Sequence, residues 1–184
     1  IKHMGGEITK DIAEALYVSI MTDTGSFRFD KTDAELHRII ADLIDNGAVP
    51  DQLYDKVHNQ NSFAITKLMG MAMATMKLYY GGKLCLMQVT KDMFRETGTN
   101  SDDIEGFVEK TLMIKGVEVG ILVSDVMERG EARISFRSKG EYPVRDLAVK
   151  FNGGGHKNAA GARILYTDFS QAVEMLVREA GNLF

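Results

Sequence analysis

Apolar residues recur at helical spacing through the first third of the chain. Behind Thr9 they stand at Ile12, Ala13, Leu16, Tyr17 and Ile20. This spacing predicts an amphipathic helix over about 9–21 with Thr9 as its N-cap. Three more helices are predicted, over about 33–46 with an N-cap from Asp30-Lys31-Thr32, over about 50–59 from Val49-Pro50, and from Asn61-Ser62 to about Met76. The last of these is interpreted as a connector that spans 61–80.

The pattern changes after the glycine turn at 80–82. A continuous apolar run at 84–89 predicts a buried strand, and alternating arms at 116–127 and 131–137, with Glu128-Arg129-Gly130 between them, predict an antiparallel hairpin. The remaining segments are assigned to short helices at 91–96 and 102–108, a helix from Pro143 to about 151, a strand at 162–166 and a closing helix at 168–180. This order predicts a mixed α/β domain over 81–184.

The composition excludes several classes of protein. With 45% hydrophobic residues, the 184-residue chain has enough apolar surface for a buried core. A net charge of −4 is too acidic for a surface that coats duplex DNA through phosphate contacts. No apolar run approaches the roughly 20 residues that span a bilayer, so no membrane segment is expected. The single cysteine, Cys85, excludes an internal disulfide and, within its apolar run, predicts a core residue of a cytoplasmic protein.

The chain begins without a methionine and enters a helical pattern almost at once. This start fits neither a signal peptide nor the beginning of a domain, so the chain is interpreted as a fragment. His3-Met4 has two interpretations: residues left by expression, or a native helix end before Gly5-Gly6.

The strongest local signal is the segment Asn152-Gly153-Gly154-Gly155-His156-Lys157-Asn158-Ala159-Ala160-Gly161. Glycines let backbone N–H groups approach an anion closely, so the segment predicts a phosphate cradle. A helical turn from Ala159-Ala160 would add free N–H groups, and His156 and Lys157 would donate to the same phosphate. The alternative is a glycine-rich turn with His156 exposed, because glycine loops often only turn the chain.

Two further candidates lie outside the glycines. Asp23, within Thr22-Asp23-Thr24-Gly25, is a carboxylate at a helix end among hydroxyls that could orient it, which suits a ligand of a hard metal. Its alternative is a turn or cap residue. Arg137-Ser138 ends a predicted strand beside the cradle, where Arg137 would grip phosphate through its fork of N–H donors. For Arg137, and also for Arg28, the alternative is a solvated charge.

Together these motifs resemble those of the DHH-family phosphoesterases. The glycine segment resembles the signature of the DHH-associated C-terminal domain, and Asp23 in Thr-Asp-Thr-Gly-Ser-Phe resembles the last motif of the DHH domain. Phe136-Arg137-Ser138 also matches, and the motifs occur in the family's order over nearly the whole chain. The resemblance implies the helical tail of a DHH domain at 1–60, a connector helix at 61–80 and a small mixed-sheet α/β DHH-associated domain at 81–184.

The nanoRNases, which also act on 3′-phosphoadenosine 5′-phosphate, are the branch that the chain is most similar to. The resemblance implies two manganese ions in the N-terminal domain and a bridging water that attacks phosphorus. Of the metal ligands only Asp23 is present, because the chain has no Asp-His-His tripeptide and no earlier Asp-x-Asp motif. The chain alone is therefore expected to be inactive.

The resemblance also implies which residues grip the substrate. These are Gly153, Gly154, Gly155, His156 and Arg137, with Ser138 and Asn158 as neighbours. The implied partners are short single-stranded RNA or DNA oligonucleotides or phosphonucleotides, and a homodimer is possible. Two alternatives remain open: a module that binds nucleotides or proteins without hydrolysis, and an exopolyphosphatase.

Overall fold

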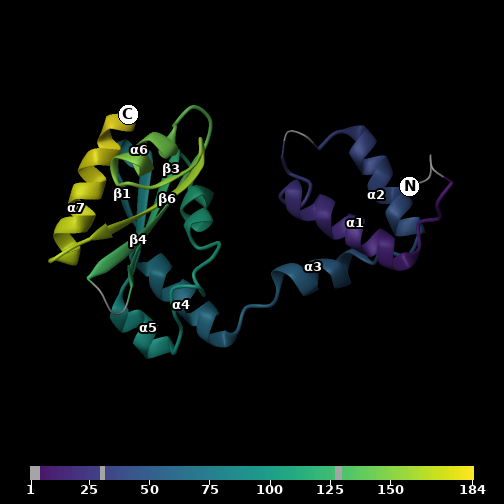
Figure 1. Ribbon diagram of the computed structural model, residues 1–184, viewed down its shortest axis with the longest axis horizontal. Coiled ribbons are helices and arrows are strands. Elements are labelled where there is room, and N and C mark those ends of the chain that lie inside the picture. The colour runs from purple at the N-terminus through teal and green to yellow at the C-terminus, as the bar shows by residue number, and fades with distance from the viewer. Residues whose placement is uncertain (1–4, 30–31, 127–129) are drawn as a thin grey trace. The chain divides into compact units, whose positions relative to one another are not determined.

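The computed structural model describes residues 5–29, 32–126 and 130–184. The chain divides into two compact units, Ile1–Asn61 and Ser62–Phe184 (Figure 1). His3-Met4 and part of the joint at 128–130 lie outside the described residues, so the two interpretations of His3-Met4 stay open.

The described part of the first unit is helical, as the apolar spacing predicted. It contains α1 (Lys10–Asp23), α2 (Ala34–Asp45) and α3 (Pro50–His58). Their apolar faces share one core, made by Ala13, Tyr17, Met21, Ile40, Leu43, Ala48 and Leu53. Thr9 caps α1 by accepting a hydrogen bond from the N–H of Ile12, which confirms its predicted role.

The cap of α2 is one residue later than expected. Asp33 is the N-cap, and its Oδ1 accepts a hydrogen bond from the N–H of Leu36 at 2.8 Å. Thr32 is therefore not the cap, while Asp30 and Lys31 lie outside the described residues. A carboxylate in extended backbone three residues before a free N–H meets the geometric requirement for capping, which a hydroxyl one residue earlier does not.

The second unit contains a mixed α/β fold, which confirms the predicted class. It begins with α4 (Phe63–Ala74), which Ser62 caps and which packs through Leu68 and Ala72 into the core of this unit. Its described strands form one six-stranded sheet in the order β1-β2-β3-β4-β6-β5. The strands are β1 (Lys77–Tyr79), β2 (Leu84–Val89), β3 (Val119–Val126), β4 (Glu131–Ser138), β5 (Gly154–His156) and β6 (Ala159–Leu165). Among these described strands, the β2–β3 pair is parallel and the other pairs are antiparallel.

The two faces of the sheet are covered differently. On one face, α6 (Val144–Lys150) and α7 (Phe169–Ala180) pack over residues from β2, β3, β4 and β6 (Figure 1). On the other face, α4, α5 (Lys91–Thr97) and the 3₁₀ helix η3 (Val108–Met113) pack on Met87, Val89 and Leu122 of β2 and β3. On that second face, Arg133 of β4 and Arg163 of β6 are exposed, while Ser135 and Arg137 are half-buried.

The predicted helix at 102–108 is wrong. The chain forms turns there, and η3 follows. Two local hydrogen bonds explain the difference: the N–H of Asp102 donates to Asn100 Oδ1, and the N–H of Asn100 donates to Asp103 Oδ2, each at 2.8 Å. Such bonds from Asn and Asp side chains compete with helical hydrogen bonds.

Other elements follow the predictions or extend them. The β3–β4 hairpin pairs Val119 with Ser138 and Val126 with Glu131, as the two alternating arms predicted. Two short edge strands, β1 and β5, were not predicted, and the chain also forms short 3₁₀ helices η2 (Tyr80–Gly82) and η4 (Gly181–Leu183). Cys85 is fully buried in β2, which confirms it as a core residue. Among the described residues, no helix has the length and apolar character to cross a membrane.

Candidate functional site

The glycine-rich segment is a tight hairpin between β5 and β6. Gly154 pairs with Gly161, Gly155 with Ala160 and His156 with Ala159. The helical turn considered for Ala159-Ala160 does not form, because both residues begin β6 and pair with β4 on the other side. Their backbone groups are used in the sheet, so no helix N-terminus contributes positive potential here.

The three glycines meet different surroundings. A Cβ on Gly153 would lie 2.7 Å from Ala162 Cβ, and one on Gly155 would lie 2.6 Å from Ala160 Cα. These distances are too short for any side chain, and Gly155 also has φ +143°, so both positions require glycine. A Cβ on Gly154 would meet nothing within 4 Å. Packing therefore does not require glycine at position 154, which borders open space.

Strand register places the candidate residues in rows on the second face of the sheet. Arg137 lies opposite Ala159, which lies opposite His156, and Ser135 lies opposite Gly161, which lies opposite Gly154. Directly opposed residues of antiparallel strands share a face. Small residues thus form a floor, with Arg137 and His156 at its sides.

A groove of about 690 Å³ lies over this floor. The lining residues come from β4, β5, β6 and the turn before β5: Arg133, Ile134, Ser135, Arg137, Asn152, Gly153, Gly154, Gly155, Ala159, Ala160, Gly161, Ala162 and Arg163. We call it the glycine groove. It combines arginine side chains with an edge strand of glycines, which is the chemistry that an anion requires.

Arg137 is held in place beside the groove. Its Nε donates to Glu109 Oε1 at 2.8 Å and its Nη1 to the carbonyl oxygen of Phe136 at 3.0 Å. A guanidinium has five N–H donors, so these two bonds fix its plane and leave others for a ligand. A smaller hollow of about 400 Å³, lined by β4 and residues from 102–108, shares Arg133, Ser135 and Arg137 with the groove.

Ser138 and Asn158 use their polar atoms within the protein. Ser138 is buried on the opposite face of β4 from Arg137, and its Oγ donates to the carbonyl oxygen of Tyr142 at 2.6 Å. The Nδ2 of Asn158 donates to Ser138 Oγ at 2.8 Å and to the carbonyl oxygen of Gly140 at 3.1 Å. These bonds attach the 138–142 loop to the β5–β6 turn and so stabilise the glycine hairpin.

The turn of the hairpin is exposed. His156 lies one residue beyond Gly155 along β5, with its side chain open to solvent. Lys157, which was expected to share a phosphate with His156, forms an ion pair with Glu141 at 2.8 Å. The Lys157 ammonium, as hydrogen-bond donor and positive charge, holds the pKa of Glu141 below its usual value.

Asp23 is the last residue of α1 and is exposed. The neighbouring hydroxyls do not orient it, contrary to expectation: Thr22 Oγ1 donates to the carbonyl oxygens of Val18 and Ser19, and Thr24 Oγ1 donates to that of Ile20. Hydroxyls near a helix end commonly satisfy backbone carbonyls in this way. No group of three or more histidine, cysteine or acidic side chains suited to a metal occurs in the part of the chain that the structure describes.

Arg28 has a local role in the same loop. Its Nε donates to the carbonyl oxygen of Gly25 at 2.6 Å, and the backbone takes positive φ at Ser26 and Phe27. Arg28 thus stabilises the strained turn that follows α1.

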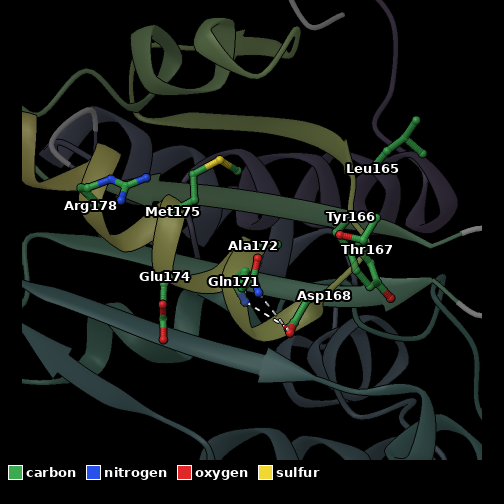
Figure 2. Close-up of a pocket in the computed structure, with 9 residues that line it drawn as sticks. All are labelled: Leu165, Tyr166, Thr167, Asp168, Gln171, Ala172, Glu174, Met175 and Arg178. Atoms are coloured by element: carbon green, nitrogen blue, oxygen red, sulfur yellow. Dashed lines mark hydrogen bonds between the residues drawn. The ribbon is translucent and has the colours of Figure 1, made fainter.

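A separate hollow of about 610 Å³ runs along α7 (Figure 2). Asp168, at one end, caps α7 by accepting hydrogen bonds from the N–H groups of Ser170 and Gln171. Figure 2 shows Gln171 turned toward Asp168, while Glu174 and Arg178 lie further along the helix. The polar groups that line this hollow do not converge on one point, so the hollow lacks the features of an anion site. We call it the α7 hollow.

The sequence did not lead us to Arg133, Ser135 and Arg163 of the glycine groove. A signal for two of them was present in β4, where Arg133, Ser135 and Arg137 alternate with apolar residues. Alternation places the three polar residues on one face. Whether this face of β4 is covered by helices depends on segments distant in sequence, so the pattern of β4 alone cannot predict it.

Comparison with known proteins identifies the family of the chain. The model of the DHHA1 domain matches residues 81–182. Two curated relatives are named bifunctional oligoribonuclease and PAP phosphatase NrnA: one from Thermus thermophilus is 33% identical over 95% of this chain and 51% of its own length, and one from Bacillus subtilis is 29% identical over 91% and 52%. The crystal structure of an exopolyphosphatase-related protein from Bacteroides fragilis has a TM-score of 0.87 and 35% identity, over 95% of this chain and 51% of that one.

The chain therefore spans about half the length of the curated relatives that it matches. The DHHA1 match covers more than half of this chain and contains every residue that lines the glycine groove. The chain belongs to the family of proteins that carry the DHHA1 domain.

Proposed function

We propose that this chain is the substrate-binding part of a manganese-dependent phosphoesterase that acts on short oligoribonucleotides, on 3′-phosphoadenosine 5′-phosphate, or on both. The glycine groove binds a phosphate of the substrate. The observation that supports this proposal is the row Arg137–Ala159–His156, in which an arginine and a histidine lie on either side of a small residue and beside the open edge at Gly154.

The chemistry of the groove favours a phosphate over a neutral ligand. Arg137 presents a guanidinium whose plane is already fixed by Glu109, so little side-chain freedom is lost when a phosphate binds. The small residues Ala159, Gly161 and Gly154 let the ligand approach the backbone closely. His156 supplies a second donor from the turn.

The proposed role of this chain is binding and orientation. Two manganese ions, when bound, would supply an activated water and neutralise the charge of the leaving oxygen. Asp23 is the residue of this chain that we propose as a ligand, since its carboxylate is exposed at the end of α1. The described residues contain no complete metal site, so we assign no step of hydrolysis to them and propose that the chain alone is inactive.

The names of the relatives support a nucleotide as substrate, because the Thermus and Bacillus proteins are named for oligoribonuclease and PAP phosphatase activities. The Bacteroides protein is named as exopolyphosphatase-related, which favours polyphosphate as a second candidate. The lack of a metal cluster among the described residues favours a third, a nucleotide-binding module without hydrolysis. The buried Cys85 supports a reducing cytoplasm as the place of action, and a homodimer stays a prediction.

Calorimetry on this chain tests the proposal with a dinucleotide that carries a 5′-phosphate and the same dinucleotide without it. The phosphorylated form should bind more tightly, and Arg137→Gln should weaken it by about 1.5–3 kcal/mol, the usual contribution of a hydrogen bond to a charged group. Arg178→Gln, which removes an exposed charge from α7, is the matched control and should change nothing.

Equal affinities for the two dinucleotides would contradict the proposal. Tighter binding of a short polyphosphate than of the phosphorylated dinucleotide would favour the second candidate. The same measurement therefore tests two statements independently: that the groove binds phosphate, and that the substrate is a nucleotide.

A further inference from the structure

Two arginines lie directly opposite each other at the far end of the glycine groove. Arg133 of β4 pairs in register with Arg163 of β6, and both line the groove and are exposed. Like charges in directly opposed positions of neighbouring strands destabilise a sheet. The repulsion between the two guanidinium groups lowers the stability of the sheet, and a bound anion would relieve this repulsion.

The protein neutralises this pair only in part. Arg163 Nη1 lies 3.4 Å from Glu131 Oε1, and the Arg163 side chain is 65% exposed. Arg133 Nη1 donates to a neutral acceptor, the carbonyl oxygen of Ser101, at 3.3 Å. Asp102 and Glu105 line the adjoining smaller hollow with Arg133, but within the described residues no ion pair joins either carboxylate to it.

The pair is separate from the Arg137 end of the groove. Arg133 and Arg137 are four residues apart on one strand, which corresponds to about 13 Å between their Cα atoms. The row of Ser135, Gly161 and Gly154 lies between them and offers a floor without bulky side chains. At this spacing, a chain that carries two or more phosphates can lie along the floor with one phosphate at each end.

We propose that Arg133 and Arg163 form a second anion site, which binds another phosphate of the nucleotide chain whose first phosphate lies at Arg137. The inference rests on the proposed function, because it extends the same groove. Two guanidinium groups on one face can donate to several oxygens of a single phosphate. The groove thus selects a short oligonucleotide over a mononucleotide, and the added affinity comes from the Arg133–Arg163 pair.

The test compares two ligands of this chain, adenosine 5′-monophosphate and a 5′-phosphorylated tetranucleotide, in wild type and in Arg163→Gln. Arg163 is the residue to change because its side chain has no backbone acceptor to lose among the described residues. We expect the variant to bind the tetranucleotide on the order of 10-fold more weakly, and the monophosphate with unchanged affinity. Arg178→Gln is again the control for loss of one exposed charge, and melting temperatures check that each variant is folded.

Salt dependence gives a second, independent readout. The slope of log K against log salt for the tetranucleotide should become less steep by about 0.7 in Arg163→Gln, because each phosphate of a single strand that a protein neutralises adds about that amount to the slope. An unchanged slope and affinity would overturn the second anion site while leaving the Arg137 site intact. Equal weakening of both ligands would also overturn it, since the two ends would then act as one. If the wild type binds neither ligand, the proposed function itself fails.

Discussion

Arg137 and Ser138 are neighbours in sequence, yet they lie on opposite faces of β4. Arg137 borders the glycine groove, while Ser138 is buried and joins Asn158 and Tyr142 in hydrogen bonds that support the hairpin. One short motif therefore contains both a residue that can contact a ligand, Arg137, and a residue that supports the site from behind, Ser138. Strand alternation separates them once the strand is known.

The adjacent glycines also differ in role, because Gly153 is required by packing whereas Gly154 borders the groove. This difference leads to a prediction. Gly154→Ala places a methyl group in open space beside the groove. We expect its folding stability to be unchanged or slightly higher, because alanine restricts the unfolded chain, while phosphate affinity falls by about 1–3 kcal/mol through crowding of the groove. Chemical denaturation and calorimetry measure the two quantities.

Gly153→Ala is the matched comparison. Its methyl would collide with Ala162 and with the carbonyl of Gly161, so this variant should lose stability. Full phosphate affinity in Gly154→Ala would show that position 154 does not border the ligand, and unfolding of this variant would show that the space beside Gly154 is not open.

At the scale of elements, the sequence predicted those helices and strands whose own pattern determines them. The helices α1, α2, α4 and α7 have apolar faces, and the β3–β4 hairpin alternates on both arms. The strand β5 could not be predicted, because its residues Gly154, Gly155 and His156 have low strand propensity and become a strand only by pairing with β6. The turns at 101–106 have a local cause instead, since side chains of Asn100 and Asp103 replace helical hydrogen bonds.

A partly buried polar cluster of Asp125 in β3, Lys91 in α5 and Tyr166 just after β6 leads to a prediction about pH. Tyr166 donates to the carboxylate of Asp125, and Lys91 Nζ lies 3.3 Å from Asp125 Oδ1. Burial, together with the hydrogen bond to Asp125, raises the pKa of Tyr166 above its ordinary value of 10.0. Hydrogen bonds to Tyr166 and Asp125 raise the pKa of Lys91 above 10.5.

Both shifts have the same consequence for stability. A raised folded-state pKa means that the unfolded chain loses its proton first, so stability is fully present below about pH 10 and is lost as the pH rises through the folded pKa. We expect the urea midpoint to fall from pH 9 to pH 11, and to fall less in Tyr166→Phe. Tyr54→Phe removes an exposed tyrosine and should behave as wild type. An equal fall in all three proteins would exclude the cluster as the cause.

For the whole molecule, the sequence motifs identified the family, and the structure divides the residues of those motifs between two units. The DHHA1 match and the glycine groove belong to the second unit, while Asp23 belongs to the first. The groove itself could not be read from the sequence, because it exists only where α4, α5 and η3 cover β2 and β3 but leave β4, β6 and β5 open. Arg133 and Arg163 become partners only through the register of two strands that are distant in sequence.

An NMR titration of this chain with adenosine 5′-monophosphate shows whether phosphate binds in the glycine groove. We predict that the largest amide shifts occur at Gly154, Gly155 and Ala159, and that Arg137→Gln abolishes them. Shifts that gather instead along the α7 hollow, from Leu165 to Arg178, would contradict the account.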